Sequence, residues 1–320
     1  MSREGESMYN IFVDGQHGTT GLKIHEYLLK HPGVKLLNID YEMRRDVKVR
    51  REYINNADIV FLCLPDSAAR EAVALVENNH TKIIDASTAH RTKDEWAYGI
   101  PELCRKQRDK IKNSNRVTVP GCHATASIIA LAPLVKGGIV PSDYPVSIFS
   151  VSGYSGGGKE MIAEYENNKD EYLKIPRHYA LGLNHKHLPE IKKYSGLTYE
   201  PIFMPVVSNY YNGLAVSIPL YTNRLLKYRT AKDICGFLTE YYAGEKFIRV
   251  IPFEDESLLI DGRFNITGCN NTNMAEIFVF GNKNRIMMMA RLDNLGKGAS
   301  GAAVQNMNIM LGINEEMGLV

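Results

Sequence analysis

The chain of 320 residues is long enough for two domains, since one domain typically takes about 100 to 200 residues. Its 38 Lys and Arg residues against 36 Asp and Glu leave a formal charge of +2, which argues against a nucleic-acid or anionic-membrane partner. A hydrophobic fraction of 44% and a charged fraction of 23% exclude wholesale disorder and predict a folded globular protein.

Other features of the whole sequence bear on its compartment. It contains no run of about 18 apolar residues, so we expect no membrane-spanning helix. Residues 1–7 (MSREGES) lack the apolar segment of a secretory signal, and we expect a frayed leader there. The odd cysteine count without CxxC spacing disfavours disulfides or structural zinc and favours a reduced, cytoplasmic setting; the cysteines are Cys63, Cys104, Cys122, Cys235 and Cys269.

The first 120 residues alternate apolar runs with polar or helical stretches. Residues 9–15 (YNIFVDG) predict a strand that ends in a glycine turn, and residues 22–31 predict a helix. Further apolar runs follow at residues 34–39, 57–64, 82–87 and 116–119. Strands that alternate with other connections in this way predict an α/β domain with a doubly wound parallel sheet.

Beyond Pro120 the pattern changes. Residues 122–135 predict a helix in spite of Pro133, and residues 145–168 predict a strand, a glycine-rich turn and a helix. Residues 201–220 and 275–292 are paired apolar runs around Asn/Gly turns, which predicts two β-hairpins. With a small-residue helix over residues 297–312, the second half is expected to be α+β with antiparallel strands.

The turn after the first strand carries Gly15, Gly18 and Gly21 in the segment DGQHGTTG. Glycines there permit a tight turn and a close approach of a pyrophosphate to the main chain, while the amides of the following helix face its negative charge. Because the turn joins the first strand to the first helix, we expect a dinucleotide site.

Charged residues after the second run bear on the type of dinucleotide. Asp40 could accept hydrogen bonds from an adenosine ribose, which favours a cofactor without a 2′-phosphate. Arg44 and Arg45 could instead pair with that phosphate. An exposed charged loop is an equal alternative, so these residues leave the choice open.

Cys122, in VPGCHATAS, is a candidate nucleophile. A thiol at the start of a helix lies near oriented amides that stabilise the thiolate, and Pro120 and Gly121 force the turn that would expose it. Buried structural roles, the usual ones for a cysteine, are expected for Cys63, Cys235 and Cys269.

His185 and His187 flank Lys186 in NHKHLPEI. In a loop or extended segment, histidines at i and i+2 point in different directions, so one is expected to face a thiol and the other to support it. Metal binding is disfavoured because no third ligand cluster has suitable spacing. An ordinary pair of surface histidines is the alternative.

Two further segments suit an anionic ligand. DASTAHR places Ser87, Thr88, His90 and Arg91 just past a strand, where Arg91 could grip an anionic substrate group or be an exposed structural arginine. SGYSGGGKE offers backbone amides and Lys159 to a phosphate. It lacks the GxxxxGK[ST] spacing of a nucleotide-triphosphate loop, which disfavours a kinase or an ATPase.

Seven segments taken in order resemble the N-acetyl-gamma-glutamyl-phosphate reductases, and more narrowly their shorter form. They are DGQHGTTG, DASTAHR, WAYGIPEL, PGCHAT, VSGYSGGGKE, HKHLPEI and LDNLGKGASGAAVQNMN, and together they cover nearly all of residues 9–313. The resemblance implies a Rossmann dinucleotide-binding domain (residues 8–120 and 295–320). It also implies an inserted α+β catalytic and oligomerisation domain (residues 121–294), as in aspartate-semialdehyde and glyceraldehyde-phosphate dehydrogenases.

The resemblance also implies a reaction and its residues. NADPH would reduce N-acetyl-L-glutamyl 5-phosphate to its semialdehyde in the arginine route, with Cys122 as nucleophile and His187, slightly favoured over His185, as acid/base. The residues implied to bind the cofactor are Gly15, His17, Gly18, Thr19, Thr20, Gly21, Arg44, Ser87, Asn294, Lys297 and Gly298. Those implied to bind the acyl-phosphate substrate are Arg91, Ser155, Gly156 and Lys159. A homotetramer or homodimer is implied as well.

The chain departs from the family pattern NPGCYPT around the nucleophile. Val119, His123 and Ala124 stand where that pattern has asparagine, tyrosine and proline, so a hydrogen bond from the asparagine is lost while the thiol is kept. His123 could tune the pKa of Cys122, although adjacent side chains on a helix do not generally face each other. Two alternatives therefore stay open: a reductase of aspartyl or aminoadipyl phosphate, and a non-catalytic NADP-sensing protein.

Overall fold

The computed structural model describes residues 8–227 and 230–319, which fall into two compact units. The first unit comprises residues up to Pro101, Lys106–Pro120 and the residues from Ala299 onwards. The second comprises Glu102–Arg105 and Gly121–Gly298. The frayed leader expected over residues 1–7 lies outside the described residues.

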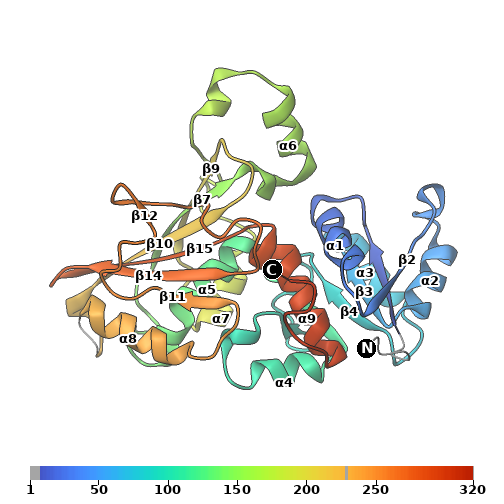
Figure 1. Ribbon diagram of the computed structural model, residues 1–320, viewed down its shortest axis with the longest axis horizontal. Helices are drawn as coiled ribbons and strands as arrows, with labels where there is room; N and C mark the ends of the chain where they lie inside the picture. Colours follow the sequence, from blue (N-terminus) through green and yellow to red (C-terminus); the bar gives the residue numbers. More distant parts are fainter. Residues whose placement is uncertain (1–7, 228–229, 320) are drawn as a thin grey trace, which may run out of the picture. The chain divides into compact units, whose positions relative to one another are not determined.

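A parallel six-stranded sheet forms the centre of the first unit, as predicted, in the order β2-β1-β3-β4-β6-β5 (Figure 1). Its strands are β1 (Tyr9–Asp14), β2 (Val34–Leu37), β3 (Ile59–Leu62), β4 (Lys82–Asp85), β5 (Ala97–Tyr98) and β6 (Arg116–Thr118). The sequence did not predict β5, because a strand of two residues is too short to show a period of two.

Helices cover both faces of this sheet: α1 (Thr19–Leu29), α2 (Val47–Asn56), α3 (Asp66–Ala74), α4 (Gln107–Lys112) and α9 (Gly301–Leu311). On β3, Ile59 and Phe61 share a buried cluster with residues of α1, α4 and α9. The alternate residues Val60 and Leu62 share another with residues of α2 and α3. Burial on both faces explains why β3 (IVFL) is an uninterrupted apolar run.

The second unit is built on a seven-stranded mixed sheet in the order β11-β14-β15-β10-β7-β9-β8. Its strands are β7 (Ser147–Gly153), β8 (Arg177–His178), β9 (Ile202–Ser208), β10 (Leu214–Tyr221), β11 (Ile248–Val250), β14 (Ala275–Gly281) and β15 (Arg285–Leu292). The pairs β7/β9 and β11/β14 are parallel and the other neighbours are antiparallel. A separate two-stranded ribbon pairs β12 (Leu259–Ile260) with β13 (Arg263–Phe264).

One of the two predicted hairpins is confirmed and the other is wrong. β14 and β15 pair directly, as predicted for residues 275–292. β9 and β10, within residues 201–220, do not pair with each other, because β7 lies between them and bonds to both. Both segments contain Asn/Gly turns. In residues 201–220, however, β7 from an earlier part of the chain pairs with each of the two strands in place of their pairing with each other.

The helices of the second unit are α5 (Cys122–Lys136), α6 (Gly158–Asn167), α7 (Leu188–Ser195) and α8 (Ala231–Tyr241). α5 packs against α7, β10 and β15, and twelve of its fifteen residues are buried. The predicted helix does continue through Pro133. Proline has no N–H for the carbonyl of Ile129, which instead accepts a hydrogen bond from the Tyr242 hydroxyl at 2.7 Å.

Short turns complete the fold. They are the 3-10 turns η1 (Tyr41–Met43), η2 (Pro101–Leu103), η3 (Tyr154–Gly157), η4 (Glu171–Lys174) and η5 (Thr222–Arg224), and the π-helical turn η6 (Gly296–Ser300). In Figure 1, α6 belongs to a segment that stands off the sheet of the second unit.

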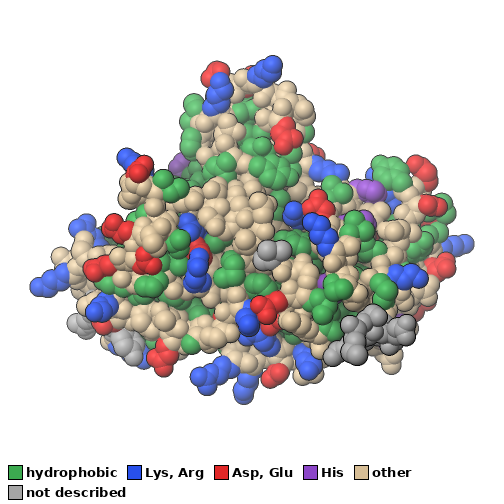
Figure 2. Space-filling model, in the orientation of Figure 1, with side chains coloured by type: hydrophobic (Ala, Val, Ile, Leu, Met, Phe, Trp, Pro, Cys, Tyr) green, Lys and Arg blue, Asp and Glu red, His purple; other side chains and the backbone are tan. Residues whose placement is uncertain are grey.

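The surface and the helices add two observations on the described residues. Over the face in Figure 2, Lys and Arg side chains are interspersed with Asp and Glu rather than gathered into one basic area. Among the helices of residues 8–227 and 230–319, none combines the length and the hydropathy that crossing a bilayer requires.

Candidate active site

The glycine turn of the first unit is shaped by two close backbone contacts. Gly15 has a φ of +89°, and a Cβ there would lie 2.3 Å from the carbonyl oxygen of Cys63. A Cβ on Gly21 would lie 2.4 Å from the carbonyl oxygen of Gly15. Neither position can hold a larger residue without a shift of backbone, so the two glycines hold β1, β3 and the start of α1 close together.

The N-terminus of α1 is open to a ligand. Gly18 is its N-cap and offers no side chain to the first amides, which belong to Thr19, Thr20 and Gly21. Among the described residues, the buried Thr19 hydroxyl has no hydrogen-bond partner. Free amides, the helix dipole and this hydroxyl together fit a pyrophosphate.

A cavity of about 390 Å³ adjoins the turn and contains arginines. His17 and Gly18 line it, together with Arg44 and Arg45. The Arg44 guanidinium lies 3.4 Å from the centroid of the Tyr41 ring and donates to the Tyr41 carbonyl. This stacking pre-orients Arg44, which makes the cavity suitable for an anionic group on a nucleotide.

Two acidic residues near this cavity differ in their contacts. Asp40 precedes η1, and its side chain caps no amide of that turn. Asp14 ends β1 and pairs with Arg50 at 2.8 Å, both side chains being buried. Burial raises the pKa of Asp14, while the hydrogen bond from Arg50 opposes that rise.

The DASTAHR segment is a rigid turn at the end of β4. Asp85 accepts hydrogen bonds from the amide and the hydroxyl of Ser87, at 2.9 and 2.8 Å, and lies 2.7 Å from Nδ1 of His90. Arg91 is buried and donates to the carbonyl of Ala86. Ser87 and Arg91 are therefore fixed in orientation at the carboxyl edge of the sheet, where parallel sheets bind ligands.

Cys122 is the first residue of α5, as predicted, and it is half-buried. The preceding Gly121 is the N-cap, with an extended conformation and no capping side chain. A Cβ on Gly298 would lie only 2.8 Å from Cβ of Cys122, so glycine leaves the room that the thiol needs. The first-turn amides and the helix dipole at this position favour the thiolate.

The start of α7 lies against the start of α5. Nε2 of His187 lies 2.2 Å from where a Cβ of Gly121 would stand, so this imidazole occupies the space beside the glycine. Glu190 accepts the Gly121 N–H at 3.3 Å and lies 4.0 Å from Nε2 of His187. A buried carboxylate, a buried imidazole and the thiol-bearing helix end therefore meet in one place.

The expectation that His185 and His187 point in different directions is wrong. Their ring centroids are 4.7 Å apart with the planes nearly perpendicular, and the His187 amide donates to Nδ1 of His185 at 3.2 Å. Alternation at i and i+2 requires an extended chain, whereas His187 has helical dihedrals of −89° and −10°.

His123 also belongs to this group. Its buried ring lies 5.6 Å from the rings of both His185 and His187, and its nitrogens contact Ser150 and Tyr179. Sequence reasoning missed Glu190, Ser150 and Tyr179, of which Glu190 alone had a signal: it lies three residues after His187 on a helical first turn.

The glycine-rich turn η3 and the end of β15 are joined by hydrogen bonds. Asn294 donates to the buried Ser155 hydroxyl at 2.9 Å and accepts the Gly213 amide at 2.7 Å. Gly156 lies near the same group, and Lys159 is exposed on α6. The structure thus brings together Asn294, expected at the cofactor, and Ser155, expected at the substrate.

Lys297 is engaged inside the second unit. Its Nζ lies 2.6 Å from Oε1 of Glu102, and both side chains are almost fully buried. The pair ties the turn before Ala299 to the segment Glu102–Arg105.

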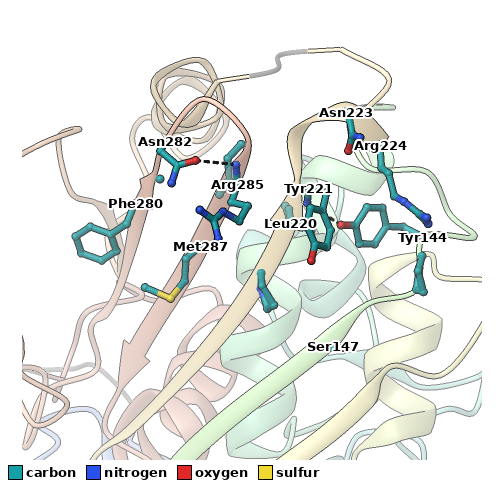
Figure 3. Close-up of a pocket in the computed structure, with 14 residues that line it drawn as sticks. Tyr144, Ser147, Leu220, Tyr221, Asn223, Arg224, Phe280, Asn282, Arg285 and Met287 are labelled. Atoms are coloured by element: carbon teal, nitrogen blue, oxygen red, sulfur yellow. Dashed lines mark hydrogen bonds between the residues drawn. The ribbon is translucent and has the colours of Figure 1, made fainter.

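A larger cavity of about 1040 Å³ opens elsewhere on the second unit (Figure 3). It lies at one end of β10 and β15, where Tyr144 accepts the Tyr221 amide at 2.8 Å and Asn282 accepts the Arg285 amide. Its lining includes no residue of what we call the Cys122 group: Cys122, His123, Ser150, Tyr179, His185, His187 and Glu190. Among the described residues, no group of three or more His, Cys, Asp or Glu is arranged to hold a metal ion.

Comparison with known proteins places this geometry in a family. The model of the semialdehyde dehydrogenase NAD binding domain matches residues 10–113, and that of the semialdehyde dehydrogenase dimerisation domain matches residues 122–294. The aspartate semialdehyde dehydrogenase from Francisella tularensis has a TM-score of 0.70 at 14% identity, over 95% of this chain and 100% of that one. Aspartate semialdehyde dehydrogenase II from Vibrio cholerae gives 0.68 at 14%, over 96% and 99%. These two show the fold.

Sequence relatives are closer. The N-acetyl-gamma-glutamyl-phosphate reductase 2 of a Nostoc species is 46% identical over 317 residues, which is 97% of this chain and 98% of the relative. The N-acetyl-gamma-glutamyl-phosphate reductase of Sinorhizobium medicae is 44% identical over 306 residues, or 94% and 98%. The chain therefore belongs to the N-acetyl-gamma-glutamyl-phosphate reductase family, whose fold is that of the semialdehyde dehydrogenases.

Proposed function

We propose that this protein reduces N-acetyl-gamma-glutamyl phosphate to N-acetylglutamate 5-semialdehyde, with release of phosphate, in arginine biosynthesis. The observation that carries the proposal is the meeting of Cys122, at the open end of α5, with buried His187 and Glu190. A nucleophile and an acid/base residue that a third group holds in place are what acyl transfer followed by reduction requires.

The first step uses the thiol. The Cys122 thiolate attacks the acyl carbon, the C–O bond to phosphate breaks, and phosphate leaves with the electron pair. A thioester on Cys122 remains, which is a better hydride acceptor than a carboxylate. Amides at the start of α5 stabilise the oxyanion, and each such donor is worth about 3 to 4 kcal/mol where it has been measured.

The second step needs a proton donor. When bound, a reduced nicotinamide would supply the hydride that reduces the thioester carbon. His187, or His185 next to it, gives a proton to the oxyanion of the resulting thiohemiacetal and takes that proton back when the thiohemiacetal collapses to aldehyde and thiolate. We favour His187 because it lies against Gly121, with Glu190 close enough to stabilise its protonated form.

The family uses a nicotinamide cofactor, and we propose that here it is NADP(H). Arg44, stacked on Tyr41 in the cavity beside the glycine turn, would pair with the 2′-phosphate. The residues proposed to hold the rest of the cofactor are Gly15, His17, Gly18, Thr19, Thr20, Gly21, Ser87, Asn294, Lys297 and Gly298. Of these, Lys297 would act through its pair with Glu102.

Substrate contacts, domain roles and assembly complete the proposal. Ser155, Gly156 and Lys159 on η3 and α6, and Arg91 after β4, would bind the acyl phosphate. Residues 8–120 and 295–320 would bind the dinucleotide, and residues 121–294 would carry catalysis and assembly. We propose a cytoplasmic homodimer or homotetramer, since exposed Met287 and Tyr221 beside the larger cavity offer a second copy an apolar surface.

The test runs the reaction backwards with purified protein. Phosphate-dependent reduction of NADP⁺ is measured with N-acetylglutamate 5-semialdehyde and, in parallel, with aspartate semialdehyde. We expect turnover with the acetylated substrate and at least 100-fold lower kcat/KM with the other. Preference for aspartate semialdehyde would assign the protein to the aspartyl branch. Absence of turnover, with Cys122 unreactive to iodoacetamide, would favour a non-catalytic NADP sensor.

A further inference from the structure

A chain of hydrogen bonds beside Cys122 has no task in the reaction described above. Nδ1 of His123 lies 2.7 Å from the Ser150 hydroxyl, and Nε2 lies 2.9 Å from the Tyr179 hydroxyl. His123 and Ser150 are fully or almost fully buried. The chain links β7, the second residue of α5 and the segment after β8, which are far apart in the sequence.

The protons along this chain can be assigned. Ser150 donates to the carbonyl oxygen of Ala215 at 3.2 Å, so its own oxygen accepts from Nδ1 of His123. A neutral imidazole protonated at Nδ1 keeps a lone pair on Nε2, which accepts the Tyr179 O–H. Burial, with the nearby charges of His185 and Lys186, lowers the pKa of His123 to about 3, so the ring is neutral at pH 7.

Tyr179 consequently presents an oxygen that can only accept. Its one proton is used toward His123, and burial, reinforced by the negative charge of Cys122, raises its pKa and keeps it protonated. The hydroxyl lies against the ring of His123, the residue that follows Cys122 on α5. The Tyr179 ring also lies 5.8 Å from the ring of His185, in the same group of side chains.

The substrate proposed above has one hydrogen-bond donor. Its carboxylate, carbonyls and phosphate only accept, whereas the amide N–H of the N-acetyl group donates. This amide is a short aliphatic chain away from the carbon that is attached to Cys122. A donor that is buried in the complex needs an acceptor, because leaving it unsatisfied costs about 1 to 3 kcal/mol.

We propose that Tyr179 is a specificity-determining residue that accepts the amide N–H of the N-acetylated substrate, and that His123 and Ser150 position it. The inference rests on the proposed reduction of N-acetyl-gamma-glutamyl phosphate. It also gives a role to His123, which stands where the family pattern has tyrosine: the imidazole orients a hydroxyl supplied by another part of the chain.

The test compares two aldehydes in the reverse reaction with NADP⁺ and phosphate. One is N-acetylglutamate 5-semialdehyde, and the other is glutarate semialdehyde, which lacks the acetamido group. Tyr179→Phe is expected to raise KM for the acetylated aldehyde about tenfold with little change in kcat, because the contact is equally present in ground and transition states. KM for glutarate semialdehyde should not change.

Three controls separate this role from a general structural one. Tyr199→Phe removes a hydroxyl from a tyrosine that is 65% exposed, and should change neither KM. Ser150→Ala should raise KM for the acetylated aldehyde by a smaller factor, and should add nothing in the Tyr179→Phe background. The wild-type protein provides a test that does not depend on the folding of any variant. Its KM for glutarate semialdehyde should be at least tenfold above its KM for the acetylated aldehyde.

The outcomes are distinct. Wild-type turnover of the acetylated aldehyde, with equal losses on both aldehydes in Tyr179→Phe, would overturn the role of Tyr179 and leave the proposed function intact. Equal wild-type KM values for the two aldehydes would do the same. Absence of wild-type turnover with the acetylated aldehyde would overturn the proposed function and this inference together.

Discussion

The glycine turn of the first unit and the Cys122 group of the second are built in opposite ways. In the turn, main-chain groups form the site: Gly15 and Gly21 admit close backbone contacts, and no side chain caps the first amides of α1. In the Cys122 group, side chains form the site. They come from α5, β7, the segment after β8 and α7.

This difference decides how each region responds to substitution. A backbone site tolerates changes of side chain but not an added Cβ, because the carbonyl oxygens that it would meet cannot move away cheaply. A side-chain site tolerates small shifts of the main chain but depends on particular functional groups. Substitutions in one region should therefore leave the function of the other largely intact.

The largest effect is expected at the sulfur. Cys122→Ser should lower kcat at least 1,000-fold, since a serine hydroxyl is a far weaker nucleophile than a thiolate. The affinity for NADP(H), followed by fluorescence titration, should stay within about twofold. Cys104→Ser removes an exposed thiol and serves as the control. A Cys122→Ser protein that keeps a tenth of the activity would refute the assignment.

The next largest effects on kcat are expected at His187 and His185, and the two substitutions should differ. His187→Asn should lower kcat about 100-fold or more, because water would have to replace the imidazole as the proton donor to the oxyanion. His185→Asn should cost less, since His185 contacts His187 rather than the glycine before the nucleophile. Single-turnover kinetics with the acyl phosphate distinguish the steps: His187→Asn should still release phosphate. The reverse ranking would make His185 the proton donor.

An added methyl group tests the backbone region. Gly21→Ala should weaken NADP(H) binding at least 100-fold and lower the melting temperature, because its Cβ would lie 2.4 Å from the Gly15 carbonyl oxygen. Gly18→Ala is a matched control, since the nearest atom to its Cβ lies at 3.4 Å. Iodoacetamide labelling of Cys122 should proceed at the wild-type rate in both. Equal loss of binding in the two variants would contradict the geometry.

Removing the charge of Arg44 from the same cavity should alter only the selectivity between NADP⁺ and NAD⁺. Arg44→Ala should weaken NADP⁺ binding about tenfold and leave NAD⁺ binding unchanged, because only the former carries a 2′-phosphate. Arg45→Ala should have a smaller effect, as Arg45 is exposed. Isothermal titration with both dinucleotides measures the difference. An equal loss for NAD⁺ would place Arg44 elsewhere on the cofactor.

The smallest effect concerns stability in acid. Burial lowers the pKa of His123 to about 3, below the 6.5 or so of an unfolded chain, so between these values only the unfolded state binds the proton. This contribution to stability is complete above pH 6.5 and is lost as the pH falls toward 3. Replacing the ring by His123→Gln should reduce the loss of unfolding free energy from pH 7 to pH 5 by about 2 kcal/mol, measured with urea. An unchanged pH dependence would mean that His123 is charged when folded.

The two regions also differ in how far the sequence predicts them. The parallel sheet, the glycine turn, the helix beginning at Cys122 and the hairpin at residues 275–292 follow from short-range patterns, and the structure confirms them. The hairpin at residues 201–220 failed because β7, an earlier strand, pairs between β9 and β10.

The Cys122 group was predicted in part. The sequence around them marked the thiol and both histidines as candidates, and the resemblance to the family implied their roles. The rule of alternation misjudged the histidine rings, because His187 is already helical. Ser150 and Tyr179 carry no local motif, and only tertiary pairing brings them to His123. Side-chain sites assembled from distant segments lie beyond what spacing alone can show.

The central claim is that Cys122 carries the acyl group between two chemical steps. The direct test mixes the protein with N-acetyl-gamma-glutamyl phosphate without any dinucleotide, quenches with acid and maps the peptides by mass spectrometry. We predict an N-acetylglutamyl adduct on the peptide that contains Cys122, and its disappearance when NADPH is added before the quench. An adduct on another side chain, or an unmodified Cys122 in protein that turns over, would contradict the account.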